Sequence, residues 1–139
     1  MELRLIGVPG IPMVQPGDDL TGQIIAAVAA MGEEILAADV IVIAQNVISK
    51  SEGRYLDLRT VTPSQEAIKL GLEVDKDPRK VQAILDESNE VVRSRRGVLI
   101  VEQRLGFVQA NAGIDQSNIP HEGDDLNNIC LLLPVDSDE

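Results

Sequence analysis

Residues 97–115 read Gly-Val-Leu-Ile-Val-Glu-Gln-Arg-Leu-Gly-Phe-Val-Gln-Ala-Asn-Ala-Gly-Ile-Asp, and this stretch decides the fold. Its apolar run 98–101 is typical of a buried strand. The Arg-Leu-Gly turn at 104–106 predicts that residues 107–110 pair with that run as a hairpin. A long polar loop, 111–127, follows. The sequence therefore predicts a β-sheet whose last strand leads into polar residues.

Helices are expected before this hairpin. Pro is favoured in the first turn of a helix, so Pro63 predicts a helix to about residue 72, and Pro78 another to Glu87 or beyond. A third helix is expected over residues 20–31, with Asp18 or Asp19 as its N-cap and Gly32 at its end. Its apolar residues are spaced as one helical face.

Further strands are expected on both sides of these helices. Residues 3–8 alternate as a half-buried strand does, whereas 40–44 form the continuous apolar run of a strand buried on both faces. Residues 54–58 and 128–133 are expected strands as well. The fold class expected is α+β (mixed α/β), with a mixed sheet and flanking helices in one domain spanning 1–139.

Composition narrows the class of function. The 139 residues carry a net charge of −11, which argues against a surface for duplex nucleic acid. The cluster Arg93, Arg95 and Arg96 suits either a small anion or a solvated face. No apolar run approaches the ~18 residues that span a membrane, and no leader is evident, so a cytoplasmic protein without a membrane partner is expected.

Cysteine and histidine often act as nucleophiles or metal ligands, but a structural role is favoured for each of them in this chain. The single cysteine, Cys130, lies in an apolar run, where a buried thiol is favoured over a nucleophile. The single histidine, His121, lies among carboxylates without convincing ligand spacing, so a solvated loop position is favoured over a metal ligand.

Three polar segments are candidates for a site. The Gly/Pro loop 10–19 can present backbone amides to a ligand or simply connect two elements. Residues 45–53 follow an expected strand, and Lys50 there suits phosphate, although a solvated turn is an equal alternative. In segment 111–118, Asp115 offers the hard oxygen that Mg²⁺ or Mn²⁺ prefers, whereas an Asx turn is the structural alternative.

Taken in order, these segments resemble the coenzyme F-420-0:γ-glutamyl ligase family. The matching strings run the length of the chain. They are Gly10-Ile11-Pro12 with Pro16-Gly17-Asp18-Asp19, Val42-Ile43-Ala44-Gln45, Ser49-Lys50-Ser51-Glu52-Gly53-Arg54, Asp77-Pro78-Arg79, Gly97-Val98-Leu99-Ile100-Val101-Glu102, Arg104-Leu105-Gly106-Phe107-Val108, Ala110-Asn111-Ala112-Gly113-Ile114-Asp115 and Ser117-Asn118.

The resemblance implies a GTP-dependent acid–amino-acid ligase. GTP would phosphorylate the side-chain carboxylate of coenzyme F-420-0, and the amino group of L-glutamate would attack the acyl phosphate. By similarity, Asp115 would bind Mg²⁺ or Mn²⁺, with K⁺ as a further candidate ion, and the enzyme would be a homodimer of mixed α/β fold. No catalytic side chain is assigned. The residues expected to contact GTP are Ile11, Pro12, Met13, Val14, Gln45, Lys50 and Asn118.

The chain departs from the family pattern in two ways. Asn46 stands where the family often carries Lys, which removes a positive charge from the expected nucleotide site. The C-terminal portion of the family, roughly a hundred residues with an Asp-Thr metal motif and a Phe-Gly-Arg string, is absent. The alternative to a ligase is therefore a non-catalytic GTP-binding or oligomerisation fragment of one.

Overall fold

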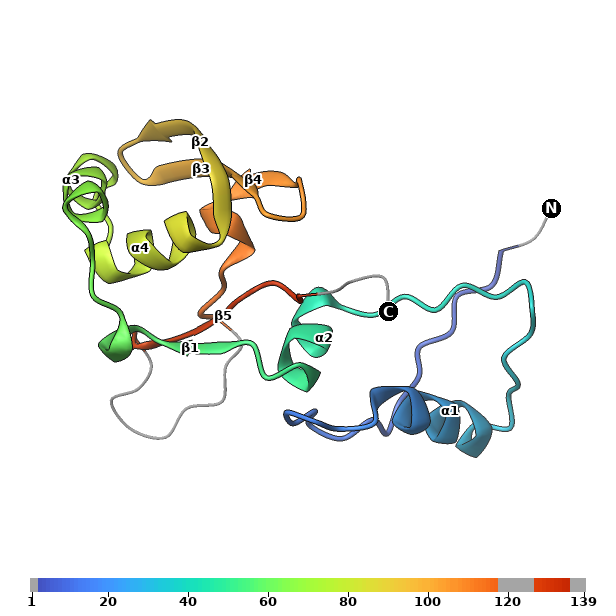
Figure 1. Ribbon diagram of the computed structural model, residues 1–139. Helices are drawn as coiled ribbons and strands as arrows, with labels where there is room; N and C mark the ends of the chain where they lie inside the picture. The colour runs from blue at the N-terminus through green and yellow to red at the C-terminus, as the bar shows by residue number, and fades with distance from the viewer. Residues whose placement is uncertain (1–2, 118–126, 136–139) are drawn as a thin grey trace.

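The computed structural model describes residues 3–117 and 127–135 and has the expected α+β class (Figure 1). Within those residues there are four α-helices, five strands and two short 3-10 turns. The helices are α1 (Leu20–Ala30), α2 (Gln45–Ser51), α3 (Gln65–Val74) and α4 (Pro78–Asp86). The strands are β1 (Tyr55–Asp57), β2 (Ser88–Arg95), β3 (Val98–Gln103), β4 (Val108–Ala110) and β5 (Ile129–Leu131), and the 3-10 turns are Leu58–Thr60 and Asn111–Gly113.

The described strands form two small antiparallel sheets. One has the order β2-β3-β4, and the other joins β1 to β5. The hairpin predicted from residues 98–110 is confirmed, with Val101 opposite Gln109. Beyond β4 the chain returns toward the second sheet, where Asp115 forms an isolated bridge with Leu131. Segments far apart in the sequence thus meet where the expected metal ligand lies.

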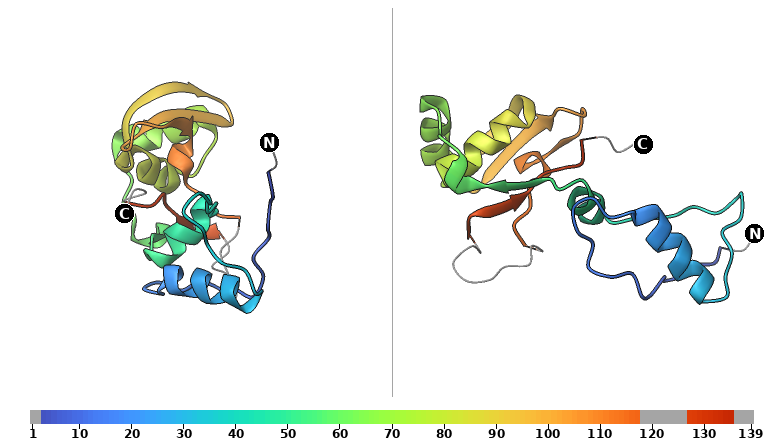
Figure 2. Two further views of the ribbon diagram at one scale, coloured as in Figure 1. Left: turned by 90° about the vertical axis from the view of Figure 1, so that its right-hand side faces the viewer. Right: turned by 60° about the horizontal axis from the view of Figure 1, so that its bottom comes forward.

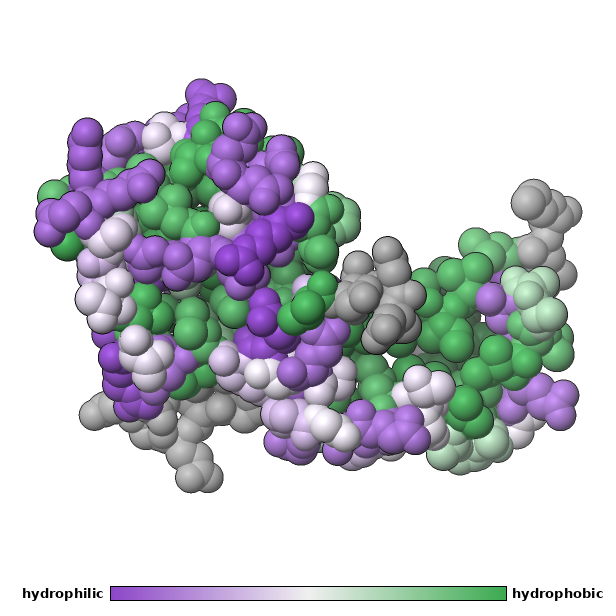
Figure 3. Space-filling model, in the orientation of Figure 1, coloured by the Kyte–Doolittle hydropathy of each residue, from purple (hydrophilic) through white to green (hydrophobic). Residues whose placement is uncertain are grey.

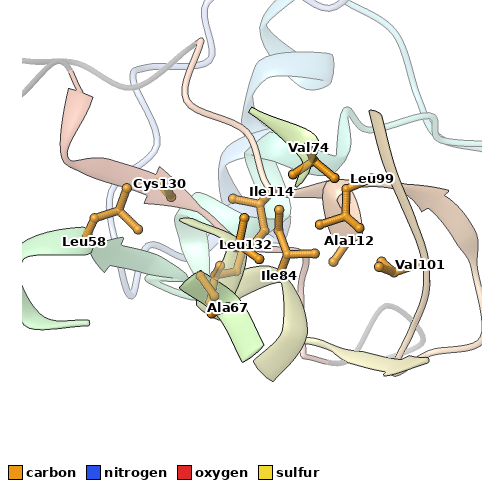
Figure 4. Packing of buried hydrophobic residues seen from close by; sticks show 12 residues of the cluster. Leu58, Ala67, Val74, Ile84, Leu99, Val101, Ala112, Ile114, Cys130 and Leu132 are labelled. Carbon is orange, nitrogen blue, oxygen red and sulfur yellow. The ribbon is translucent and has the colours of Figure 1, made fainter. Parts of the chain in front are cut away.

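One apolar core holds α3, α4 and both sheets together. Leu58, Ile84 and Leu99 belong to this cluster and are at most 1% exposed, and Figure 4 shows how they lie within it. Burying such side chains contributes roughly 1.5–3 kcal/mol each. Cys130 lies in the same cluster and is also fully buried, as predicted. The core gives the second half of the chain a rigid body on which the site residues are mounted.

Local signals explain three of the helix starts. The carboxylate of Asp77 accepts from the amide of Arg79 and Pro78 occupies the first turn, so α4 begins where predicted. The cap of α1 is Asp19, whose side chain accepts from the amide of Gly22. Helix α3 is capped by Ser64, which leaves Pro63 just outside the helix instead of in its first turn.

Two strand predictions were wrong. Residues 3–8 and 40–44 are extended coil, and Val40 and Val42 are 84% and 89% exposed. A strand needs a neighbour to satisfy its backbone groups, and the described chain brings none alongside either segment. Residues 45–51, for which a ligand-binding segment and a solvated turn were equal alternatives, form α2. Strand β2 begins at Ser88, just after α4 ends, and no sequence pattern indicated it because its side chains are mostly exposed.

The molecule has an uneven shape. Figures 1 and 2 show α1 and the coils on either side of it standing away from the body formed by α3, α4 and the sheets, with α2 between them. In this first part of the chain Val14 and Ile24 are the buried apolar residues. No helix in the described ranges has the length and apolar character needed to cross a membrane.

Candidate functional site

Asp115 is held at both its backbone and its side chain. Its amide donates to the carbonyl of Leu131 at 3.0 Å and its carbonyl accepts from the Leu131 amide at 2.8 Å, which fixes it to β5. Its Oδ1 accepts from the amide and hydroxyl of Ser117 at 2.9 and 2.7 Å. Its Oδ2 accepts from Nδ2 of Asn46 at 2.9 Å. The carboxylate is therefore presented in one orientation before any ligand binds.

These donors also keep Asp115 ionised. The pKa of its carboxyl is lowered to about 2, chiefly by the Ser117 amide and hydroxyl; burial opposes this shift, and the Asn46 hydrogen bond, a smaller effect than burial, adds to the lowering. Hydrogen bonds to the charged form favour that form. At neutral pH the group is a fixed anion with hard oxygen donors, as Mg²⁺ or Mn²⁺ requires.

Helix α2 carries the other predicted polar residues to the same place. Gln45 and Lys50 line an open hollow together with Asn46 and Met13. The hollow is a shallow depression, wide open to solvent, with a volume of about 560 Å³. Asn46 faces Asp115 from the same helix, so the hollow and the carboxylate are joined through one side chain.

The Gly/Pro loop 10–19 packs on the end of α2. The amide of Gly17 donates to the carbonyl of Ser51 at 2.8 Å, and Val14 is buried. Of the four loop residues expected to contact GTP, Met13 lines the hollow, while Ile11, Pro12 and Val14 do not. The structure therefore brings Met13, Gln45, Lys50 and Asp115 to one neighbourhood.

A strained turn leads into Asp115. Asn111, Ala112 and Gly113 all have φ between 53° and 71°, although only glycine adopts this region readily. A Cβ on Gly113 would lie 2.8 Å from a methyl of Leu133, so the turn is packed tightly. The side-chain oxygen of Asn111 is buried without a hydrogen-bond partner among the described residues. Consecutive αL residues at a site store strain that the surrounding structure must support.

Arg54 is a supporting residue that the sequence did not single out. Its Nε donates to the Leu133 carbonyl at 2.8 Å, and its guanidinium pairs with Glu87 at 3.1 Å. The side chain thus joins the end of α2, the segment after β5 and the start of β2. Its place at the end of the Ser-Lys-Ser-Glu-Gly-Arg string was the available signal.

Other candidates do not join this site. Asn118 and His121 lie outside the described residues. Arg96 pairs with Asp75, and Arg93 and Arg95 are exposed on β2. Residues 3–117 and 127–135 contain no cluster of three or more His, Cys, Asp or Glu that would hold a metal. None of the described residues that line the hollow is acidic, and Asp115 is connected to it through Asn46.

The family model for F420-0:Gamma-glutamyl ligase matches residues 10–139. The chain belongs to this family. A coenzyme F420:L-glutamate ligase of Methanothermobacter thermautotrophicus is 44% identical over 99% of this chain, and one of Methanopyrus kandleri is 40% identical over 98%. A third, from Methanocaldococcus jannaschii, is 49% identical over 73%.

The chain covers only part of the length of its relatives in the F420-0:gamma-glutamyl ligase family. The chain spans 52% and 50% of the first two relatives, so about half of their length has no counterpart here. The matched half includes every residue of the hollow and Asp115.

Proposed function

We propose that this chain is the nucleotide- and metal-binding half of a GTP-dependent ligase that adds L-glutamate to coenzyme F-420-0. The observation that carries the proposal is the Asn46–Asp115 contact of 2.9 Å, which sets an ionised carboxylate beside the hollow lined by Gln45 and Lys50. Family membership supplies the reaction class, because the relatives are named coenzyme F420:L-glutamate ligases.

The side chains that line the hollow are suited to binding a nucleoside triphosphate. Lys50 offers a compact cation to phosphate oxygens, and the Gln45 amide offers both donors and acceptors. The side-chain nitrogen of Gln45 already donates to Ser49 Oγ at 2.8 Å, which leaves its carbonyl oxygen for a ligand. Met13 lies across the hollow as an adaptable apolar wall. By the resemblance, Ile11, Pro12, Val14 and Asn118 extend the same contact.

Asp115 is the residue that would hold a divalent metal. Its ionised, oriented oxygens are of the kind that Mg²⁺ or Mn²⁺ prefers, and the described residues do not surround it with a cluster of three or more His, Cys, Asp or Glu. The remaining ligands would be phosphate oxygens, water and residues of the family's other half. When bound, such an ion neutralises the charge of phosphoryl oxygens.

The chemistry asks the protein for positioning and electrostatics. Transfer of the γ-phosphoryl group of GTP to the F-420-0 carboxylate releases GDP and gives an acyl phosphate; attack of the glutamate amine on its carbonyl carbon then forms the amide and releases phosphate and a proton, without a covalent protein intermediate. The fully buried Cys130, whose pKa is raised by that burial, is in keeping with this. In this scheme Lys50 and Asp115 orient the triphosphate, and Asn46 orients Asp115. A homodimer is the oligomer expected from the resemblance.

A second candidate function is a GTP-binding portion that is not catalytic by itself. It is favoured because the described residues contain no cluster of three or more His, Cys, Asp or Glu that would hold a metal. The two candidates share the nucleotide contacts and differ in whether this chain alone forms the amide bond.

The test combines binding with turnover. The 139-residue chain is titrated with GTP and Mn²⁺ in a calorimeter and then incubated with F-420-0 and glutamate, with product followed by mass. We expect nucleotide binding that Lys50→Ala weakens at least tenfold and that Lys69→Ala, an exposed lysine of α3, leaves unchanged. A glutamyl mass gain lost in Asp115→Ala supports the complete ligase, and binding without product supports the second candidate. Absence of GTP binding would refute both.

A further inference from the structure

The two charged residues of the candidate site stand on different elements. Lys50 belongs to α2, whereas Asp115 is fixed to β5 through two backbone hydrogen bonds with Leu131. A nucleoside triphosphate and its metal would have to meet both residues at once, so the spacing between α2 and β5 decides whether they act together. Helix α2 has only seven residues and is too short to hold its place without contacts to the rest of the chain.

Arg54 holds the end of α2 against the segment that continues β5. The Arg54 amide donates to the carbonyl of Ser49 at 2.9 Å, which closes the turn of backbone that carries Lys50. The Arg54 carbonyl accepts from the amide of Leu132 at 2.9 Å, and Nε of Arg54 donates to the carbonyl of Leu133 at 2.8 Å. Helix α2 and the segment after β5 are thus joined through one residue.

Glu87 ties Arg54 to the body of the protein. Its carboxylate accepts from Nη2 of Arg54 at 3.1 Å, and its own carbonyl, between α4 and β2, accepts from the amide of Arg104 at 3.1 Å. The two side chains of the pair are 22% and 13% exposed. Figure 3 shows a largely polar surface over α3, α4 and β2, and the pair of Arg96 and Asp75, 85% and 65% exposed, is a solvated pair of the ordinary kind. Exposed pairs hold their geometry weakly, whereas a mostly buried pair keeps its partners in place.

The segment after β5 also contacts the turn that leads into Asp115. Leu131 pairs with Asp115, and a methyl group of Leu133 lies so close to Gly113 that a Cβ there would be 2.8 Å away. Leu133 itself is buried. The segment is therefore held both by Arg54 and by the chain that carries Asp115. A shift at either contact has to reach the other, because close-packed side chains leave little free space.

We propose that the ion pair of Arg54 and Glu87 is a positioning device, which holds α2 at the spacing from β5 that the site requires. At that spacing Lys50 and Asp115 can engage one triphosphate and its metal. Neither member of the pair lines the hollow, so the pair acts on a ligand through α2 and the segment after β5. The engagement of a nucleotide rests on the proposed function. The spacing itself does not, because it also governs whether Asn46 reaches Asp115.

The experiment separates positioning from stability in the 139-residue chain. The variants are Arg54→Met alone and Arg54→Met combined with Glu87→Gln, which leaves no unpaired charge behind. The matched control is Arg96→Met, at an exposed ion pair. NMR of the Asn46 side-chain amide, assigned by its absence from Asn46→Ala, reports the hydrogen bond to Asp115. Calorimetry with GTP and Mn²⁺ reports nucleotide binding, and urea unfolding reports stability.

We expect Arg54→Met to move the Asn46 amide signals toward those of a solvated side chain, to weaken GTP binding about tenfold and to lower stability. The double variant should recover most of the stability, because no buried charge is left unpaired. It should recover neither the Asn46 signals nor the GTP affinity. Arg96→Met should leave all three measurements unchanged.

Two outcomes would overturn the proposal. Unmoved Asn46 signals in the double variant, or a GTP affinity that returns together with its stability, would show that the pair only stabilises the fold. If Arg54→Met does not fold, the double variant carries both readouts by itself. Absence of GTP binding by the unsubstituted chain would refute the proposed function, and the Asn46 signals would still decide the role of Arg54 and Glu87.

Discussion

Replacing Asn46 by alanine tests whether Asp115 is oriented by its neighbours. The substitution removes the Nδ2 donor that lies 2.9 Å from Asp115 Oδ2, while the Ser117 donors remain. The pKa of Asp115 should then rise from about 2 toward its ordinary value of 3.8 without reaching it, since Ser117 is the larger cause of the shift. Carboxyl carbon chemical shifts followed by NMR measure that change.

The same substitution should cost about 1 kcal/mol of unfolding free energy. The whole shift of Asp115, from 3.8 to about 2, corresponds to ~2.4 kcal/mol at ~1.36 kcal/mol per pH unit. Asn46 accounts for the smaller share, and partial exposure of Asp115 lets water replace some of the lost bond. Urea unfolding at pH 6, without added metal, measures the difference from the unsubstituted chain.

The pH dependence fixes the sign of the effect. A carboxyl whose folded pKa is lowered stabilises the fold above its unfolded pKa, and that contribution is lost as pH falls through the folded value. The difference between Asn46→Ala and the unsubstituted chain should therefore stay constant from pH 7 to 4 and shrink toward pH 2.

A matched control is available on the hairpin. Asn89 also donates its side-chain amide to a carboxylate at 2.9 Å, that of Glu102, but this pair is exposed. Asn89→Ala should cost less than ~0.5 kcal/mol, as exposed surface changes usually do. Equal losses for the two variants, or an Asn46→Ala loss that persists unchanged at pH 2, would refute the claim that Asn46 acts on an ionised Asp115.

Three further outcomes are expected. Gly113→Ala should destabilise the fold by about 2–4 kcal/mol in thermal unfolding, because φ is +71° and the new Cβ meets Leu133 at 2.8 Å; an unchanged melting temperature would contradict the tight turn. Cys130 should resist iodoacetamide in the folded chain and react fully in urea, because it is buried and burial raises its pKa; rapid native alkylation, read by mass, would be inconsistent with its place in the core. Ile84→Ala should cost about 2–5 kcal/mol by urea titration, whereas the exposed control Leu72→Ala should cost under ~0.5 kcal/mol; similar costs would contradict the burial assigned to Ile84.

Where local signals agreed with the tertiary structure, the sequence predicted the fold well. The hairpin of β3 and β4 was readable because its apolar run, its Gly turn and its second strand are adjacent in sequence. The start of α4 was readable because Asp77 and Pro78 are both start signals. Strand β2 was missed because its side chains are mostly exposed, so it lacks the alternation that marks a half-buried strand.

The sequence suggested candidate site residues by their type and gave no indication of how they are arranged. Asp115 was a candidate because its carboxylate is a hard oxygen ligand, and Lys50 because its side chain is a cation. No sequence pattern indicated that Asn46 and Asp115, 69 positions apart, form a hydrogen bond. The backbone pairing of Asp115 with Leu131 places the Asp115 carboxylate close to α2. Arg54, which supports the same junction, contacts Leu133 and Glu87, which lie 79 and 33 positions away in the sequence.

The two wrong strand predictions carry information of another kind. Runs such as 40–44 are selected by burial, so their composition records an environment that the described chain does not supply. The hydrophobic core around Ile84 and Leu99 includes no residue of 40–44. This explains how α3, α4 and the two sheets can pack together while segment 3–43 leaves many apolar side chains exposed. Residues 40–44 lead directly into α2, which lines the hollow. The exposed apolar segment and the hollow are therefore connected by continuous backbone. Anything that orders residues 40–44 should therefore also order the start of α2, and if that ordering favours nucleotide binding, nucleotide must favour the ordering by the same factor.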